Sequence, residues 1–493
     1  MEKYDLAIIG AGPSGYAAAM RALDFKKKIL LIERKRLGGT GVTNGALSSK
    51  TWWEISTETS LVLRNLKRFN MDPPQINYKE IQGEVIKATD RRKDLLRSHM
   101  ELLNGSVYKD LLNFELGNAR LASPNEIEIE TQNGKKTIWS DYVILATGSR
   151  PRELPHIPLD EKIVMTSEGI EKLEDFPDSM VIVGAGVIGC EYATIFSGFG
   201  KTKVNLIDKG DRILPNEDDD VVKVIETNME ANGVLIHRNS RLTKMDIVDG
   251  KVNYELEYDD GRKEIFHVER ALLSVGRIPN YENLGLEEIG VNMDKSGIID
   301  DNTQTSVPNI YAVGDITADI ALVNVGELEG RYAVECIFGN PRRKLVYENI
   351  STIMFLNPEV AGVGLNEIQA KKKGIDYKVA SLSYECIPRA IAQRNTQGFI
   401  KLLVTNDEEM KILGMRVIGQ HSSSAIQAVA LLISMDKGIE ELAECVHPHP
   451  SIIEGIQEVV RMLMGKSLFK PDALKDKMRC STYCNGVYED ILF

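Results

Sequence analysis

Two glycine-rich turns, each lying between a short apolar strand and a helix of small residues, constrain the fold of this chain most strongly. The first lies in DLAIIGAGPSGYAAAMRAL and contains Gly10, Gly12 and Gly15. The first glycine allows a tight turn, the second lets a pyrophosphate approach the backbone, and the third lets helix and strand pack closely. Free N–H groups at the helix N-terminus would then meet the pyrophosphate.

A carboxylate follows this turn at the spacing of a dinucleotide-binding fold. The next apolar strand, in KILLIER, carries Glu33 near its end, about 20 residues beyond the turn. A carboxylate at the end of that strand suits a ribose diol. Strand, turn, helix and carboxylate together predict a nucleotide site in the N-terminal part of the chain.

The same pattern occurs a second time. In the segment SMVIVGAGVIGCEYATIF, Gly184, Gly186 and Gly189 follow a second apolar strand. Two such patterns imply two dinucleotides, one in each of two domains. KVNLIDKGDRILP supplies Asp208 at the matching distance, and its charge favours NAD because it would repel a 2′-phosphate. Lys209 and Arg212 lie close by in the sequence and could tolerate that phosphate, so NADP stays possible.

Length, charge and cysteine usage narrow the class of protein. The chain has 493 residues, which at roughly 100–200 residues per domain allows two to four domains. A formal net charge of −12 argues against nucleic acid or an anionic membrane as the main partner. No run of about 18 apolar residues and no basic-then-apolar leader is visible, so we expect neither a membrane span nor secretion. The cysteines are scattered, which suits a reducing cytosol and predicts a cytoplasmic protein.

Two further segments are expected to bring the chain back to the first nucleotide-binding fold. YVILATGSRPRELP is typical of a strand leading to a crossover, and TSVPNIYAVGDIT is typical of a second return. We expect Asp315, in the second segment, at the start of a following helix, where the helix dipole favours a carboxylate.

Eight ordered motifs carry a resemblance to a known family. They are GAGPSG, ILATGSRP, VGAGVIGCE, SVGRIPN, NIYAVGD, FLNPEVAGVGL, RAIAQRNTQGFIKL and HPHPSIIE. The chain resembles the dihydrolipoamide dehydrogenase branch of the FAD-dependent pyridine nucleotide–disulfide oxidoreductases over almost its whole length. The resemblance implies an α/β fold with two Rossmann-like dinucleotide-binding domains, for FAD and NAD, and an α+β C-terminal dimerisation domain. The implied limits are 1–150 with 275–345 for a split FAD domain, 151–274 for the NAD domain, and 346–493 for the interface of a homodimer.

The resemblance also implies cofactor contacts beyond the glycine turns. Asp315 would accept a hydrogen bond from the ribityl chain of the flavin, as an alternative to a role at a helix end. The matching motifs place at the cofactors Gly39, Thr40, Lys50, Thr147, Gly148, Gly276, Arg277 and Gly314.

One segment departs from the family at the centre of its chemistry. The resemblance predicts a redox-active C-x-x-x-x-C pair in GGTGVTNGALSSK, but Gly41 and Ala46 stand at the two sulfur positions. The hydroxyls of Ser48, Ser49 and Thr51 cannot cycle between two oxidation states as thiols do. No cysteine lies nearby in the sequence. The direct route from reduced flavin to an internal dithiol is therefore absent.

The electron entrance, meaning the residues beside which hydride would reach the flavin, matches the family in contrast. Lys50 corresponds to the lysine that the family places by the flavin N5 edge, and Glu191 corresponds to the glutamate that pairs with it. Such a pair would fix the lysine charge beside the isoalloxazine and help hydride arrive from the nicotinamide. A structural interpretation also stays open, in which Lys50 is a solvated helix residue and Glu191 a first-turn carboxylate that favours the helix dipole.

HPHPSIIEGIQEVVRML matches the acid/base segment of the family. The resemblance makes His449 an acid/base oriented by Glu454, and both would serve the flavin site of the partner subunit. A carboxylate fixes the tautomer of an imidazole and raises its basicity. Two alternatives remain. Ser451-x-x-Glu454 is also a capping box, and His447 with His449 could bind a metal, although no further ligand cluster is apparent and we expect no metal.

A second departure lies in IALVNVGELEGRYA. The family usually has Ala-His-Lys-Ala near the flavin, and this chain has Val323, Asn324, Val325 and Gly326. Together with Gly41 and Ala46, this predicts a changed acceptor pocket with space on one flavin face. Trp52 and Trp53 could line that space for a flat acceptor, although such aromatic residues more often belong to the core.

The C-terminal segment MRCSTYCNGVYEDILF raises a second question about sulfur. Some relatives carry a C-terminal cysteine pair that visits the active site of the partner subunit. Cys480 and Cys484 share one face if this segment is helical. The alternative is two free thiols in a reducing cell.

Three functions remain open from the sequence. The leading hypothesis is an FAD-dependent NAD(P)H oxidoreductase that passes hydride from NADH through flavin to a quinone, a dye, oxygen or a second nicotinamide nucleotide. The second is a thiol–disulfide oxidoreductase that uses Cys480 and Cys484. The third is a non-enzymatic nucleotide-binding homodimer that serves a lipoyl-type complex.

Overall fold

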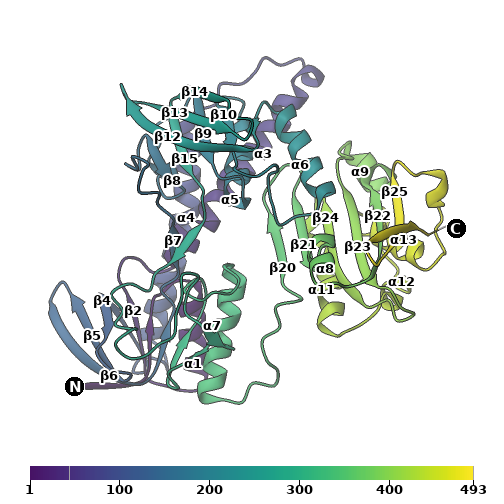
Figure 1. The fold of residues 1–493 in the computed structure, drawn as a ribbon. Helices are drawn as coiled ribbons and strands as arrows, with labels where there is room; N and C mark the ends of the chain where they lie inside the picture. Colours follow the sequence, from purple (N-terminus) through teal and green to yellow (C-terminus); the bar gives the residue numbers. More distant parts are fainter. Residues whose placement is uncertain (44, 492–493) are drawn as a thin grey trace.

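The described residues, 1–43 and 45–491, fold into three parts that each contain their own main sheet (Figure 1). In this computed structural model the first sheet lies at lower left in Figure 1, the second above it and the third at the right. Two of the main sheets are largely parallel and the third is antiparallel. This arrangement confirms the predicted α/β fold with an α+β C-terminal part.

The first sheet has the order β17-β18-β19-β6-β1-β2-β3, with β5 paired to β6 and β4 to β5. Its central strands are parallel and consist of buried apolar residues, because a parallel sheet is covered on both faces. The strands are β1 (Glu2–Ile9), β2 (Ile29–Glu33), β3 (Leu112–Leu116), β4 (Asn118–Leu121), β5 (Glu126–Thr131), β6 (Gly134–Leu145), β17 (Asp300–Asp301), β18 (Gln304–Thr305) and β19 (Ile310–Ala312).

Helices α1 (Pro13–Asp24) and α7 (Val323–Phe338) share a core with one face of this sheet. Small residues let the two helices approach closely, since a side chain at Gly330 of α7 would collide with the backbone of α1 at Ser14. Two long helices, α3 (Ala46–Phe69) and α4 (Tyr78–Asn104), follow the short α2 (Gly39–Thr43). Helix α3 reaches the second part, where the Ser56 hydroxyl donates to the Ile195 carbonyl at 2.8 Å.

The second part contains a parallel sheet in the order β11-β10-β9-β15-β8 and an antiparallel sheet in the order β12-β13-β14. Their strands are β8 (Val164–Thr166), β9 (Ser179–Val183), β10 (Lys203–Ile207), β11 (Leu235–His237), β12 (Ser240–Val248), β13 (Lys251–Tyr258), β14 (Lys263–Val268) and β15 (Arg270–Leu273). Helices α5 (Val187–Gly198) and α6 (Asp219–Ala231) and the 3-10 turn η1 (Ile170–Lys172) belong to this part. The pair β7 (Ser149–Pro151) and β16 (Arg277–Pro279) links it to the first part.

The third part is an antiparallel sheet in the order β20-β21-β24-β23-β22-β25-β26. Its strands are β20 (Ser351–Met354), β21 (Val360–Gly364), β22 (Tyr377–Ser383), β23 (Phe399–Thr405), β24 (Ile412–Ile418), β25 (Met478–Cys484) and β26 (Val487–Asp490). Its helices are α8 (Glu367–Lys372), α9 (Pro388–Gln393), α10 (Ser422–Ala425), α11 (Gln427–Ser434), α12 (Glu440–Ala443) and α13 (Glu454–Leu463), with 3-10 turns η2 (Tyr384–Cys386) and η3 (Pro471–Ala473).

The C-terminal segment is a β-hairpin at the edge of this sheet, so the helical arrangement considered for its cysteines is wrong. Cys480 and Cys484 both lie on β25, which pairs with β22, and Cys480 is buried. Four residues of extended strand span about 13 Å, whereas the Cα atoms of a disulfide lie at most about 7 Å apart. The two cysteines cannot form a disulfide with each other in this conformation.

A buried cluster of charges joins the second and third parts. Lys401 of β23 lies 2.7 Å from Asp218 and from Asp220 near the start of α6, and 3.1 Å from Glu367 of α8. Arg479 of the C-terminal hairpin also pairs with Glu367, at 3.0 Å. Burial alone would raise the pKa of Glu367, but Lys401 and Arg479 outweigh it and lower that pKa to about 2. The cluster therefore holds charged groups that neutralise one another inside the protein.

Helices able to span a bilayer would need a long apolar stretch. Every helix within 1–43 and 45–491 is too short or too polar for that.

Candidate functional site

The first glycine turn has the geometry that only glycine allows. Gly10 follows β1 with φ of 108°, and a side chain there would collide with the backbone of Ala146, which directly follows the neighbouring strand β6. A side chain at Gly15 would in turn collide with the Gly10 carbonyl. These two glycines hold helix α1 directly behind the end of the strand.

Gly12 has a different role in this turn, because it faces open space. Among the described residues, no atom outside its own neighbours lies within 4 Å of a Cβ built on Gly12. Gly12 is also the N-cap of α1, and no described side chain caps that end of the helix. The free N–H groups and the open space fit the pyrophosphate of a dinucleotide.

The Glu33 carboxylate lies beside this turn, at the end of β2. Its Oε2 accepts the Ala11 N–H at 2.9 Å, and its Oε1 accepts the Lys35 N–H at 2.8 Å. These hydrogen bonds fix the carboxylate at the carboxyl edge of the sheet, where a ribose would lie.

The second part repeats this construction with other residues. Gly184 has φ of 102°, and Gly186 is the N-cap of α5 and faces open space as far as the described atoms reach. A side chain at Gly189 would collide with the Gly184 carbonyl. Asp208 accepts the N–H groups of Ala185 and Gly210, each at 2.8 Å. The geometry fits a second dinucleotide.

The two basic residues near Asp208, Lys209 and Arg212, differ in their surroundings. Arg212 is bonded through its guanidinium to Asp219 and to the Glu217 carbonyl, so its charge is already engaged. Lys209 is exposed. Asp208 therefore remains the charge fixed beside the second glycine turn.

The other predicted cofactor residues gather at the junction of the first and second parts. Thr147 donates to the Asn280 carbonyl at 2.6 Å, and the Gly148 carbonyl accepts the Asn280 N–H at 2.8 Å. The Gly276 carbonyl accepts the Arg152 N–H at 2.9 Å. A side chain at Gly39, the first residue of α2, would approach the Cα of Gly12 to 3.0 Å, which places Gly39 and the adjacent Thr40 beside the first glycine turn.

Asp315 lies in a turn after β19, so its expected place at the start of a helix is wrong: α7 begins only at Val323. The Ser149 hydroxyl donates to the Asp315 carboxylate at 2.7 Å, and Arg277 lies 3.9 Å from that carboxylate. Burial lowers the pKa of Arg277, although Asp315 opposes the shift. Gly314, with φ of 73°, makes the turn that presents Asp315.

Lys50 and Glu191 meet across two helices from different parts. Lys50 Nζ on α3 lies 2.7 Å from Glu191 Oε2 on α5. The glutamate is 7% exposed and the lysine 28%. The pair therefore places an ammonium group, partly open to solvent, between the two dinucleotide-binding parts.

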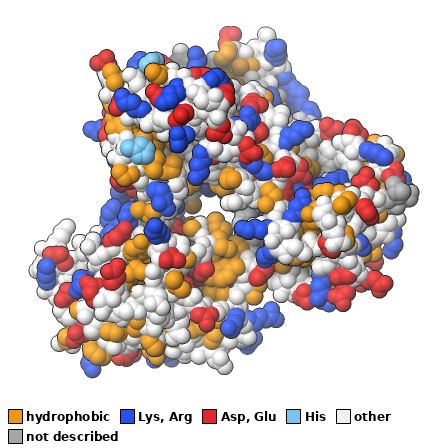
Figure 2. All heavy atoms as spheres, viewed as in Figure 1, with side chains coloured by type: hydrophobic (Ala, Val, Ile, Leu, Met, Phe, Trp, Pro, Cys, Tyr) orange, Lys and Arg blue, Asp and Glu red, His pale blue; other side chains and the backbone are white. Residues whose placement is uncertain are grey.

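Gly41 and Ala46, the residues that the resemblance aligns with the two sulfur positions of the family, differ in their surroundings. Gly41 lies in α2, where a Cβ would contact Pro13 Cγ at 3.0 Å and Val323 Cγ2 at 3.4 Å. Ala46 begins α3 and is exposed. Figure 2 shows hydrophobic side chains along the hollow between the first part and the other two. The space next to Gly41 is thus bounded by apolar groups and not fully empty.

His449 and Glu454 form the predicted pair. His449 Nδ1 donates to Glu454 Oε1 at 2.6 Å, and the imidazole is 70% exposed. The Ser451 N–H donates to the other Glu454 oxygen, which is one of the two hydrogen bonds of a capping box. The other is not formed, because the Ser451 hydroxyl has no partner among the described atoms and α13 begins only at Glu454. Burial alone would raise the pKa of Glu454, but these hydrogen bonds hold it below its ordinary value.

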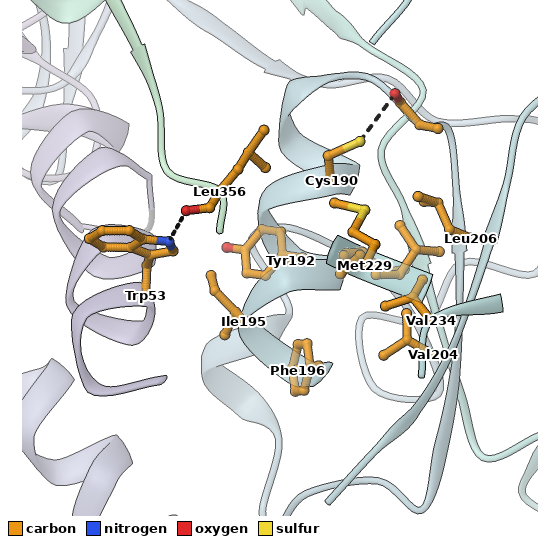
Figure 3. Close-up of a cluster of buried hydrophobic side chains, with 14 of the residues drawn as sticks. Trp53, Cys190, Tyr192, Ile195, Phe196, Val204, Leu206, Met229, Val234 and Leu356 are labelled. Carbon is orange, nitrogen blue, oxygen red and sulfur yellow. Dashed lines mark hydrogen bonds between the residues drawn. The ribbon is translucent and has the colours of Figure 1, made fainter. Parts of the chain in front are cut away.

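Within the described ranges, no three His, Cys, Asp or Glu side chains are grouped so as to hold a metal ion. Trp52 and Trp53 are buried in the core that joins α3 to the second part, so the alternative in which they line an acceptor pocket is wrong. Figure 3 shows Trp53 facing Leu356, next to Tyr192 and Ile195 of α5.

Two further residues at the site escape sequence reasoning. Phe355 contributes its backbone N–H to Glu191 at 3.0 Å, a contact that leaves no trace in residue type. Glu329 on α7 accepts the Gly314 N–H at 2.6 Å and the Tyr347 hydroxyl at 2.9 Å. Burial raises the pKa of Glu329 to about 7. The one sequence signal for Glu329 is its four-residue spacing after Val325, on the buried side of a helix.

Comparison with known proteins agrees with this geometry. Residues 4–330 match the family described as pyridine nucleotide-disulphide oxidoreductase, and residues 350–460 match its dimerisation domain. The dihydrolipoyl dehydrogenase of Bacillus subtilis (strain 168) is 30% identical over 484 residues, covering 94% of this chain and 99% of the relative. That of Chlamydia muridarum is 32% identical over 478 residues, covering 96% and 100%.

Solved structures show the same fold. LpdA from Mycobacterium tuberculosis has a TM-score of 0.84 at 24% identity, covering 94% of this chain and 100% of that chain. The HOCl-induced flavoprotein disulfide reductase RclA from Escherichia coli has a TM-score of 0.80 at 22% identity, covering 93% and 99%.

The matched segments include both glycine turns and strands β20 to β24 of the third sheet, and the curated relatives are matched over almost their full length. Dihydrolipoyl dehydrogenases use FAD and NAD(H), and the two glycine turns of this chain fit two dinucleotides. The resemblance carried by the motifs is therefore confirmed, and the chain belongs to the pyridine nucleotide-disulphide oxidoreductase family.

Proposed function

We propose that this chain is an FAD-dependent NADH oxidoreductase that passes electrons to an acceptor other than an internal disulfide. One observation carries the proposal. The Lys50–Glu191 pair is formed at 2.7 Å, whereas Gly41 and Ala46 stand where the family has its two sulfurs. The pair that would help the flavin accept hydride is therefore formed, whereas the disulfide that would receive the electrons in the family has no counterpart at Gly41 and Ala46.

The two dinucleotides would bind at the two glycine turns. FAD would lie along Gly10, Gly12 and Glu33 with its ribityl chain near Asp315, and NADH along Gly186 and Asp208. When bound, FAD supplies a ring that accepts hydride and releases electrons to a second substrate. We assign these roles to residues 1–150 with 275–345 and to residues 151–274, and the separate sheets of the two parts support that division.

The protein side chains would position the reaction. Lys50 presents a positive charge toward the flavin cleft, and the buried Glu191 holds that charge in place. Asp208 selects NADH over NADPH, because its carboxylate is fixed and Arg212 is bonded elsewhere. These groups are held on helices and strand ends, so little reorganisation is needed when NADH binds.

The acceptor would approach the face bounded by Gly41 and Val323. A quinone, a dye, oxygen or a second nicotinamide nucleotide could accept electrons there without a thiol. His449, exposed and oriented by Glu454, would protonate the acceptor bound to the partner subunit. This requires a homodimer formed through residues 346–493, which the matched dimerisation domain supports. A cytoplasmic location, suggested by the scattered cysteines, completes the proposal.

Anaerobic addition of NADH to the flavin-loaded protein tests this function. The flavin absorbance should bleach, and turnover with quinones or NADP analogues should be unchanged in the Cys480→Ser, Cys484→Ser double variant. An unbleached flavin would instead favour a non-enzymatic nucleotide-binding partner. Loss of turnover in the double variant would favour the thiol–disulfide alternative, which the strand position of both cysteines does not support.

A further inference from the structure

We propose that Phe355 is a positioning residue for the Lys50–Glu191 pair, through which the third part of the molecule supports the electron entrance. The proposal rests on the proposed function, since it assigns Phe355 to the same hydride-accepting site. Phe355 directly follows β20, the edge strand of the third sheet. It belongs to neither of the two parts that carry the glycine turns.

Glu191 uses one oxygen for each neighbour. Its Oε2 accepts Lys50 Nζ at 2.7 Å, and its Oε1 accepts the Phe355 N–H at 3.0 Å. A carboxylate held at both oxygens cannot rotate away from the lysine. The backbone of the third part therefore fixes the orientation of the glutamate.

The Phe355 ring acts on the lysine itself. Lys50 Nζ lies 4.9 Å from the centroid of that ring, within the range of a cation–π interaction. The ammonium group is thus held between the Glu191 carboxylate and the Phe355 ring. These two contacts restrict a long side chain that would otherwise sample many rotamers.

Trp53 fixes Phe355 in turn. The two rings pack edge to face with centroids 5.1 Å apart, and Trp53 Nε1 donates to the Leu356 carbonyl at 3.2 Å (Figure 3). Trp53 lies on α3, one turn beyond Lys50, and Leu356 is buried. Helix α3 therefore holds both the lysine and the segment that positions it.

The contacts close a ring through all three parts. Helix α3 carries Lys50 and Trp53, helix α5 carries Glu191, and the segment after β20 carries Phe355. A shift of the third part by about an ångström would lengthen the hydrogen bond to Glu191 beyond its normal range. The position of the Lys50 ammonium group at the electron entrance therefore depends on how the third part, the dimerisation domain, packs against the other two parts.

The test compares substitutions of Phe355 by stopped-flow reduction of the flavin-loaded protein with NADH. Phe355→Leu keeps an apolar side chain but removes the aromatic face, and the reduction rate should fall about tenfold with little change in NADH affinity. Phe355→Tyr keeps that face and should restore most of the rate. Phe266→Leu, a half-buried aromatic residue of the second part that is absent from this contact ring, is the matched control.

A double-mutant cycle separates positioning from general packing. In the Lys50→Met background, Phe355→Leu should have no further effect on the reduction rate, because the lysine it positions is gone. Additive losses, or equal losses in Phe355→Leu and Phe266→Leu, would overturn the proposal.

The cycle is repeated on the apoprotein by urea unfolding, which needs no activity. The two substitutions should be coupled there by about threefold in the unfolding equilibrium constant, and no coupling would contradict the contact. If NADH fails to reduce the wild-type flavin while this coupling is present, the proposed function falls and the positioning contact stands. If NADH reduces the flavin and the coupling is absent, the proposed function stands and the positioning contact falls.

Discussion

Lys401 Nζ lies 2.7 Å from Asp218 Oδ2, and both side chains are buried although they come from different parts of the molecule. The Asp218 carboxylate also accepts the N–H groups of Glu367 and Ile368 at the start of α8. One carboxylate from the second part therefore both neutralises a lysine and caps a helix of the third part. The angle between these parts is set by charge pairing as well as by apolar contact.

Removing this lysine should destabilise the protein strongly. Lys401→Met would leave Asp218 and Glu367 buried beside a methyl group, and breaking a buried pair in this way costs about 3–5 kcal/mol. Urea unfolding followed by circular dichroism measures the loss. Lys378→Met, on the neighbouring strand β22, removes a half-buried lysine that donates a long hydrogen bond, 3.4 Å, to the Asp407 carbonyl, and should cost far less. Equal losses in the two variants would contradict the role of the cluster.

Glu329 should make stability fall as pH rises. Its pKa is about 7 in the folded protein against an ordinary value of 4.5, because burial disfavours the carboxylate. Between pH 4.5 and 7 the unfolded chain has released this proton while the folded protein still binds it, so unfolding becomes easier. The contribution reaches about 3 kcal/mol. The difference in unfolding free energy between wild type and Glu329→Gln, measured across this range, should show the decrease, and a constant difference would refute it.

Substitutions of Gly10 and Gly12 in the first turn should have different effects on stability and on FAD binding. Gly10→Ala places a side chain at positive φ against the Ala146 backbone, and such strain costs about 1–3 kcal/mol of stability. Gly12→Val points into open space, so the protein should fold with a loss of about 1 kcal/mol at most, from the poorer N-cap, and lose FAD affinity. Urea unfolding of the apoproteins and fluorescence titration with FAD separate the two effects. A Gly12→Val variant that binds FAD normally would place the pyrophosphate elsewhere.

Asp208 should decide between the two nicotinamide nucleotides. Asp208→Asn removes the charge but keeps an oxygen for the Ala185 N–H, so the turn should survive. The preference for NADH over NADPH, measured as the ratio of kcat/KM values, should fall about 10- to 100-fold, the value of a charged hydrogen bond. Asp211→Asn, exposed and three residues away, is the control. An unchanged ratio would show that the ribose is recognised by other groups.

The sulfur positions can be tested by restoring the sulfur. Gly41→Cys with Ala46→Cys should produce a long-wavelength charge-transfer band from a thiolate beside the flavin once the protein is reduced. A Cβ at Gly41 would meet Pro13 Cγ at 3.0 Å, so the proline ring must shift slightly, whereas Val323 Cγ2 at 3.4 Å is at ordinary contact distance. If the double variant folds, binds flavin and shows no band, the assignment of the two positions is wrong.

Local patterns carry the sequence predictions that the structure confirms. Gly10 and Gly184 stand directly after apolar strands, and the turn geometry follows from residues that are neighbours in the chain. Lys50 and Glu191 are 141 positions apart, so only the family resemblance could pair them. Their contact depends on how α3 crosses α5, which no local pattern encodes.

Tertiary context explains the predictions that failed. Asp315 precedes α7 by several residues because the chain needs a turn at Gly314 before the helix can pack on α1. Cys480 lies on a strand because the exposed edge of β22 offers backbone partners to the C-terminal segment. Phe355 gives no sequence signal because its contribution to Glu191 is a backbone N–H, which every residue except proline possesses.

The two glycine turns have a consequence for how the cofactors are told apart. Ala11 donates to Glu33 in the first turn just as Ala185 donates to Asp208 in the second, so under the proposed function each turn would bind the same adenosine-bearing half of its ligand. Discrimination would then come from the unlike halves of the two molecules, at Lys50 and Asp315 rather than at the glycines. Free ADP should compete at both clefts, and its two inhibition constants would measure how alike the receptors have remained.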